Sequence, residues 1–157
     1  MGNSYSDPGQ SNPSIIRYNK NGSLDQNFRS LGYANFPVSG SWTRIWSNKI
    51  IQLPNKKILI GAAVNHYSKD SGPALLCFNE NGSKNLEFGG NITSSYDGQK
   101  IYGLYLLPGV YSTVNKIILD PTENSILLTA NPYSFLWAYN FKLKYIFTYE
   151  IVIFEKI

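Results

Sequence analysis

The feature that most constrains the fold is an internal repeat with an offset of 60 residues. Residues 15–28 match residues 75–88 without a gap, and five of the 14 positions are identical: two Asn, a Gly, a Ser and a Phe. Both segments open with the pattern apolar-apolar-x-aromatic. A fixed period of this size is typical of proteins in which small supersecondary units stack, because one unit cannot bury its own apolar face.

A second repeated element lies between these two copies. Residues 49–61 match residues 116–129 at an offset of 67, so the second unit has gained residues. We place the gain in an enlarged loop around residues 94–109. A decayed third copy begins at residues 136–140, which resemble residues 75–79 but are not followed by an Asn-Gly-Ser turn.

Apolar runs and turn residues alternate in a way that predicts an all-β fold of antiparallel sheet repeats. Aromatic residues make up 15% of the chain, and turn residues interrupt the apolar runs nearly every ten positions. Two hairpins are expected, the first closed by a turn at Pro54, where no ladder N–H is needed. The predicted strands are residues 48–53, 57–64, 114–119 and 125–130 in the hairpins, and residues 14–19 and 74–79 before the Asn-x-Asn-Gly-Ser turns.

The repeat also divides the chain. We predict a flexible N-terminal segment at residues 1–13 and a β-repeat domain at residues 14–157. The units of that domain are residues 14–73, 74–135 and a degenerate 136–157. Phe28 and Phe88 are expected to anchor the ends of the two turn segments.

The repeated residues resemble the delta-60 repeat, a family found mainly in bacterial proteins. Its pattern is an aromatic residue followed by Asn-x-Asn/Asp-Gly-Ser-Leu-Asp-x-x-Phe, then a Pro-Asn/Asp-x-Lys-Ile-Leu-Ile-x-Gly hairpin. The first unit matches through Asn19, Asn21, Gly22, Ser23, Leu24, Asp25, Phe28, Leu53, Pro54, Lys57, Ile58, Leu59, Ile60 and Gly61. The second unit keeps the turn and Phe88, but has Lys84-Asn85 for Leu-Asp and Thr129 for the hairpin glycine. The resemblance covers about residues 14–140. It implies β-propeller-like blades and no catalytic activity.

A closed propeller has at least four blades, and two and a half repeats are visible. We therefore expect a partial propeller, a piece of a larger one, a ring completed by oligomerisation, or sheets that stack openly. Residues 145–157 form β-structure readily and fit no repeat position. They are expected either to supply a closing strand or to mediate self-association through an unpaired edge.

No motif points to catalysis, a cofactor or a metal. Asn19, Asn21, Ser23 and Asp25 place oxygen atoms at alternate positions, but a calcium loop needs several carboxylates and a bidentate acid twelve residues in. We interpret this segment as an Asx turn. The acids are scattered, and the sequence has no phosphate-binding glycine loop.

The single histidine and the single cysteine do not suggest a catalytic pair. His66 and Cys77 fall in different predicted strands, and a Cys-His pair needs mutual hydrogen-bond reach. His66 is expected on the surface. Cys77 stands where the first unit has Arg17, which predicts a position that tolerates exposure.

Charge and hydropathy restrict the partners. The net charge is +4, but only Lys56 and Lys57 are adjacent and the three arginines are dispersed, which argues against nucleic acid. The sequence has no run of about 18 apolar residues, so no membrane span is expected. The polar N-terminus does not have the pattern of a signal peptide. The compartment stays open, with the cytoplasm slightly favoured and export by a non-classical route as the alternative.

Aromatic residues supply the remaining candidates. Residues 41–46, Ser-Trp-Thr-Arg-Ile-Trp, combine two tryptophans with an arginine, and several tyrosines lie in the enlarged loop. Aromatic rings together with arginine are frequent on partner-binding surfaces, although the cores between blades also need aromatic rings. The candidate partner-binding residues are Trp42, Arg44, Trp46, Tyr102, Tyr105 and Tyr111. The sequence thus predicts a non-catalytic module that binds a protein or glycan partner. The alternatives are a structural subunit completed by oligomerisation and a hydrolase using scattered carboxylates.

Overall fold

The chain is built of stacked antiparallel β-sheets, and no helix occurs in the residues that the structure describes. The computed structural model describes residues 2–4, 12–36, 42–66, 71–93, 100–107, 112–120, 125–132, 139–144 and 154–156. The prediction of an all-β fold with antiparallel sheets is confirmed.

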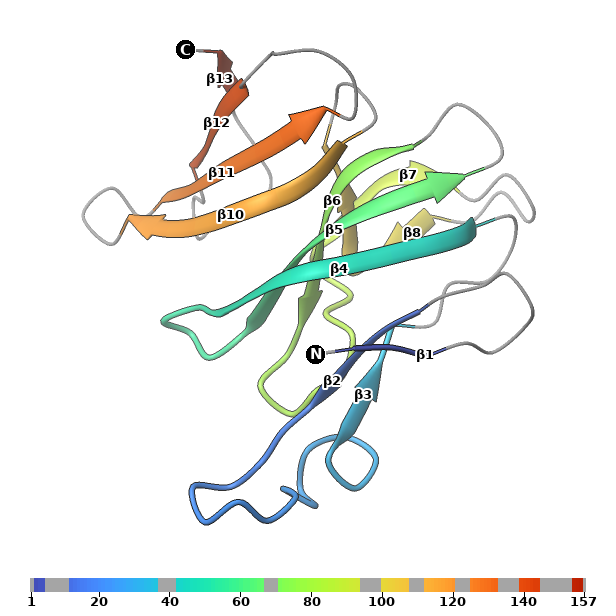
Figure 1. The fold of residues 1–157 in the computed structure, drawn as a ribbon, viewed down its shortest axis with the longest axis vertical. Helices are drawn as coiled ribbons and strands as arrows, with labels where there is room; N and C mark the ends of the chain where they lie inside the picture. Colours follow the sequence, from blue (N-terminus) through green and yellow to red (C-terminus); the bar gives the residue numbers. More distant parts are fainter. Residues whose placement is uncertain are drawn as a thin grey trace.

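Three sheets follow one another along the long axis of the molecule (Figure 1). The first sheet contains β1 (Gly2–Ser4), β2 (Asn12–Ile16) and β3 (Tyr33–Asn35). The second has the order β4 (Trp42–Gln52), β5 (Ile58–His66), β6 (Gly72–Phe78) and β9 (Leu104–Leu106). The third contains β10 (Ser112–Asp120), β11 (Ser125–Pro132), β12 (Tyr139–Lys144) and β13 (Phe154–Lys156). A two-stranded ladder pairs β7 (Gly89–Thr93) with β8 (Lys100–Tyr102).

Both predicted hairpins are present. β4 pairs with β5 and β10 with β11, so that Ile50 lies opposite Ile60 and Ile117 opposite Leu128. Two backbone hydrogen bonds between Leu53 and the residues after Pro54 close the first hairpin, and neither needs an N–H from the proline.

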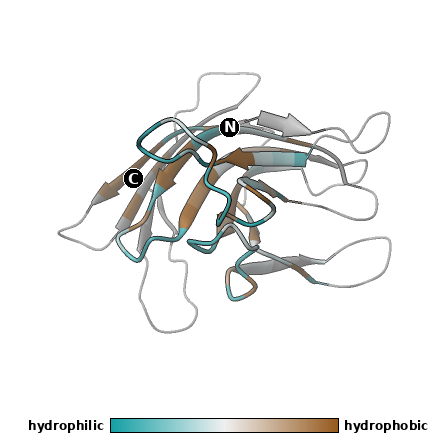
Figure 2. Cartoon of the chain, turned by 90° about the horizontal axis from the view of Figure 1, so that it is seen from below, coloured by the Kyte–Doolittle hydropathy of each residue, from teal (hydrophilic) through white to brown (hydrophobic). Residues whose placement is uncertain are grey.

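The apolar residues are buried in two clusters, one on each face of the second sheet. Along β5, Ile58 and Ile60 face the first sheet, whereas Leu59 faces the third, as the two-residue period of a strand requires. All seven residues of β6 are buried because this strand has a sheet on either side. In Figure 2 the hydrophobic colouring follows the strands, and the loops nearest the viewer are hydrophilic. Each fully buried Leu, Ile or Phe contributes about 1.5–3 kcal/mol.

The first two units have equivalent hydrogen bonds at the end of the repeat. The amide of Arg17 donates to the carbonyl of Gly32, and the amide of Cys77 donates to that of Gly103. The amides of these two glycines in turn donate to the carbonyls of Phe28 and Phe88, respectively. β9 is therefore the counterpart of β3, and Gly103 is the counterpart of Gly32.

These equivalences locate the extra residues of the second unit. Three residues separate Phe28 from Gly32, and 14 separate Phe88 from Gly103, so the insertion has 11 residues. It is the segment that contains the β7–β8 ladder. The predicted loop at residues 94–109 is wrong for residues 100–107, which contain β8 and β9, because Leu104 and Leu107 are needed in the two cores.

The predicted alignment of the third copy is also wrong. Ile58 pairs with Phe78, and its repeat partner Ile126 pairs with Leu143, so Leu143 is the counterpart of Phe78. The sequence comparison had placed Tyr139 there, four residues earlier. The Asn-Gly-Ser turn, which would have marked the register, is absent from this copy.

The predicted boundaries of the units stay predictions. Within residues 1–13, Gly2–Ser4 pairs with Asn12–Ser14. β1 corresponds in register to Ala62–Val64 of β5, because both segments pair with equivalent parts of β2 and β6. Within residues 145–157, Phe154–Lys156 pairs with Phe141–Leu143 and forms the last strand of the third sheet; the other residues of this stretch lie outside the described part.

Candidate functional site

The two Asn-x-Asn-Gly-Ser turns are structural, as the Asx-turn interpretation predicts. In the first, the side-chain oxygen of Asn21 accepts hydrogen bonds from the amide and the hydroxyl of Ser23. In the second, the Asn81 oxygen accepts from the Ser83 amide. Gly22 and Gly82 take φ of 83° and 82° to complete the turns. Of the oxygen atoms that suggested a calcium loop, those of Asn21 and Ser23 are engaged within the turn, and Asp25 pairs with Arg17.

A polar groove of about 420 Å³ lies between the second turn and the residues that flank the first turn. Its lining residues are Arg17, Asn27, Asn79, Glu80 and Asn81. The Arg17 guanidinium binds the Asp25 carboxylate at 2.7 Å, donates to the Glu80 carbonyl, and lies 4.4 Å from the centre of the Phe28 ring. Most of these polar groups have hydrogen-bond partners within the chain, so the contacts across the groove hold the two units together.

Cys77 corrects the prediction of a position that tolerates exposure. Its exposed fraction is 1%, and burial raises the pKa of its thiol to about 12, against a weaker opposing effect of Lys57. The physical reason is what each side chain packs against: Cys77 lies in the apolar cluster between the second and third sheets, whereas Arg17 meets polar groups, the Asp25 carboxylate and the Glu80 carbonyl. The acid that pairs with Arg17, Asp25, is correspondingly replaced by Asn85 opposite Cys77.

A Cys-His pair is excluded by the register. Cys77 lies opposite Leu59, and His66 is seven residues further along β5, which is about 23 Å at the rise of a strand. The His66 side chain lies outside the described part. Among the described residues, no group of three His, Cys, Asp or Glu gathers to hold a metal ion. No helix in the described residues is long and apolar enough to cross a membrane.

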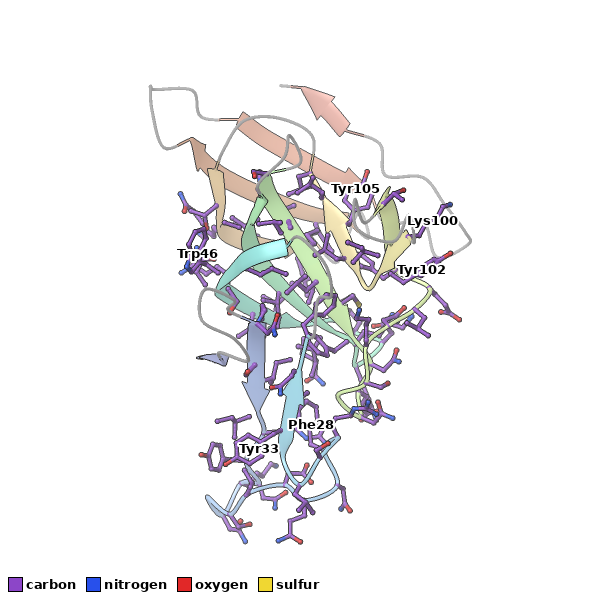
Figure 3. All side chains as sticks on the ribbon, turned by 90° about the vertical axis from the view of Figure 1, so that its right-hand side faces the viewer. Phe28, Tyr33, Trp46, Lys100, Tyr102 and Tyr105 are labelled. Carbon is purple, nitrogen blue, oxygen red and sulfur yellow. The ribbon has the colours of Figure 1, made fainter. Side chains whose placement is uncertain are left out.

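The candidate aromatic residues do not share one surface. Trp46 is exposed on β4, on the opposite side of the molecule from Tyr102 (Figure 3). Tyr105 packs against Phe88, with ring centres 6.5 Å apart, and its burial raises the pKa of its hydroxyl. Trp42 and Arg44 lie in β4, but their side chains, like the whole of Tyr111, lie outside the described part.

The insertion presents the best candidate. Tyr102 on β8 has an exposed fraction of 46%, and Lys100 projects on the same side (Figure 3). The Tyr102 ring lies on Gly90 of β7: a Cβ there would come within 3.1 Å of the ring, and φ of Gly90 is 76°. The glycine and the ladder together present an aromatic ring beside an ammonium group.

Sequence reasoning identified Tyr102 but missed Lys100 and the polar groove. Lys100 faces the same side as Tyr102 because both lie on β8 two residues apart. Residues 100–102 were expected to lie in a loop, so the two-residue spacing of Lys100 and Tyr102 did not indicate that they share a face. The groove forms between Arg17 and Asn27 of the first unit and the turn at Asn79–Asn81 of the second, and only the three-dimensional structure brings these segments together.

Comparison with known proteins bears on the fold. A family model described as "Domain of unknown function (DUF5122) beta-propeller" matches residues 1–28 and 53–88. The two matches end at the equivalent residues Phe28 and Phe88. The repeats are β-propeller-like. The comparison does not distinguish the delta-60 repeat within that class, and its matches cover less than half of the chain. Neither the curated proteins nor the solved structures contain a match.

Proposed function

We propose that this protein is a non-catalytic β-propeller-like module that binds a protein or glycan partner through its insertion. The observation that carries the proposal is the β7–β8 ladder. It is inserted into the second of two otherwise equivalent hydrogen-bonding patterns, and it exposes Tyr102. Departures from a repeat are usually found on its binding face. A ring fixed on glycine offers a flat apolar surface at little entropic cost, and the adjacent Lys100 offers hydrogen-bond donors.

The chemistry of the described residues supports binding rather than turnover. The Cys77 thiol is buried and protonated, and the closest ion pairs, Arg17–Asp25 and Lys56–Glu80, stabilise turns at the junction of the units. A sugar ring or an extended peptide matches the exposed surface of the ladder, because both combine an apolar face with polar edges.

The test compares two exposed residues of the second unit. We expect Tyr102→Ala to weaken binding at least tenfold, measured by a glycan array and by titration calorimetry with any glycan that binds. For a protein partner, a photo-crosslinking side chain at position 102 should capture one defined species. Leu86→Ala removes another exposed apolar side chain and should leave both readouts unchanged. Equal loss in both variants, or no loss in Tyr102→Ala, would contradict the proposal.

A structural subunit is the second candidate function. The described residues form three stacked sheets, whereas the smallest closed propellers have four blades. Copies that complete a ring together would resolve the difference. Light scattering over a range of protein concentrations tests this candidate, and a monomer at all concentrations would overturn it.

A further inference from the structure

The outward face of the first sheet carries apolar side chains that the fold elsewhere buries. Ile16, Tyr18 and Tyr33 lie on this face and are exposed. The register of β2 with β3 matches that of β6 with β9, so their counterparts in the second unit are Leu76, Phe78 and Leu104, respectively. These three counterparts are fully buried.

The buried counterparts show what such a face contacts. Leu76, Phe78 and Leu104 belong to the cluster that contains Ile15, Phe28, Ala34 and Phe36 of the first unit. The Phe36 and Phe78 rings meet edge to face, with centres 5.6 Å apart. Within the chain, this face of a unit therefore packs against the opposite face of the preceding unit.

Ile118 marks the matching face at the other end of the stack. Ile51 lies on the face of the second sheet that receives the third sheet, and it packs against that core. Its repeat partner in the third sheet is Ile118, on the outward face, with an exposed fraction of 41%. Ile117, the residue before it on β10, points inward to Gly61 and is buried.

We infer that the outward face of the first sheet docks on the outward face of the third sheet of a second copy of this chain. The contact would repeat the two internal ones, head to tail, and so join copies into a ring or an open stack. Tyrosine in place of Phe and Leu suits a surface that is exposed in the free monomer and buried in the assembly. Ser14 and Asn35, hydrogen-bonded to each other at 2.9 Å, replace further apolar residues at the rim of this face.

This inference rests on the second candidate function and specifies its interface. The experiment measures the mass of the full chain by sedimentation and light scattering as a function of concentration. We expect Tyr33→Lys and Ile118→Lys each to weaken association at least tenfold. Ile50→Lys is the matched control, because Ile50 and Ile118 have exposed fractions of 43% and 41%, but Ile50 lies on β4 of the second sheet and on neither outward face. Circular dichroism checks that every variant folds.

Mixing the variants separates a head-to-tail contact from a symmetric one. A copy carrying Tyr33→Lys retains its third-sheet face, and a copy carrying Ile118→Lys retains its first-sheet face. Their mixture should therefore form heterodimers, whereas a contact between two identical faces would not recover. If the wild-type chain associates and Tyr33→Lys associates equally well, the inference is wrong but the structural-subunit function stands. A wild-type monomer at every concentration overturns both.

Discussion

At the scale of single residues, the repeat provides its own controls. Gly22 and Gly82 occupy equivalent turns with φ of 83° and 82°, yet a Cβ at Gly22 would meet nothing within 4 Å, whereas one at Gly82 would lie 2.8 Å from the Phe28 ring. We expect Gly22→Ala to cost about 1 kcal/mol from the left-handed backbone alone. Gly82→Ala should cost about 1–3 kcal/mol more, because the Phe28 ring must move.

Urea denaturation of both variants measures that difference directly. The two substitutions change the same backbone conformation, so the difference reports the packing between the first and second units. Equal losses of unfolding free energy would show that Gly82 makes no closer contact than Gly22 does. Phe28→Leu should cost less in the Gly82→Ala background than in the wild type, since it removes the ring that the new methyl group meets.

Burial of Cys77 makes a second prediction at this scale. Because its pKa is raised from 9.0 to about 12, the folded protein keeps the thiol protonated in a range where the unfolded chain has lost the proton. The stability that this proton contributes is full below pH 9 and falls as the pH rises towards 12. We expect iodoacetamide to label Cys77 slowly in the folded protein at pH 9 and rapidly in concentrated guanidinium chloride. Equal rates would contradict the burial.

At the scale of the strands and sheets, the contact between β5 and β10 is the tightest test of the stack. A Cβ on Gly61 would lie 2.7 Å from a methyl group of Val114 and 3.1 Å from Ile117. We expect Gly61→Ala to destabilise the protein by about 1–3 kcal/mol through overpacking. Val114→Ala should be less costly in that background than in the wild type, because the alanine methyl fills the space that the valine leaves.

A double-mutant cycle by urea denaturation measures this coupling, expected at about 0.5–3 kcal/mol in favour of the double variant. Ala62→Gly, on the same strand as Gly61, is the control, because it changes the freedom of the backbone without overpacking. Gly103→Ala cannot serve, because the φ of Gly103 is 77° and alanine would be strained there. Additive effects at Gly61 and Val114 would contradict direct packing of β5 on β10.

The sequence predicted strands and turns where their chemistry is local. The hairpin at Pro54 and the Asn-Gly-Ser turns depend on residues within a few positions of one another, and the structure has them where the pattern placed them. Lys84 looks like a departure from the repeat, because the first unit has Leu24 at the equivalent position. In the structure the methylene stem of Lys84 nevertheless covers Gly103, as Leu24 covers Gly32. Its ammonium lies 4.4 Å from the Phe36 ring centre, and burial lowers its pKa.

What the sequence could not predict depends on the stacking of units. Cys77 and Arg17 occupy equivalent positions in sequence, but Cys77 packs into the apolar cluster with the third sheet, whereas Arg17 contacts the Glu80 carbonyl of the second unit. The short strand β9 has a local pattern too weak to stand out from a loop, and its pairing with β6 spans about 30 residues. The candidate site has the same limit, since Tyr102 and Lys100 are neighbours only once β8 is known to be a strand.

At the scale of the whole molecule, two routes to self-association compete: the face of the first sheet, and the stretch 145–157. The described part of that stretch, Phe154–Lys156, pairs with Phe141–Leu143 inside the chain and covers the edge of β12. An uncovered strand edge offers unpaired N–H and C=O groups to other chains. Removing residues 145–157 should therefore increase association, with a larger mass at the same protein concentration.

Removal of Ile157 alone is the control, because it leaves β13 and its pairing with β12 intact. The shortened chain should also respond to Tyr33→Lys less than the full chain does, since its new edge provides a contact that does not involve the first sheet. Light scattering at matched concentrations decides between the routes; it compares the full and the shortened chain, each with and without Tyr33→Lys, and the chain without Ile157. If residues 145–157 themselves joined the copies, their removal would instead leave a monomer, and the tail rather than the apolar face would be what holds the assembly together.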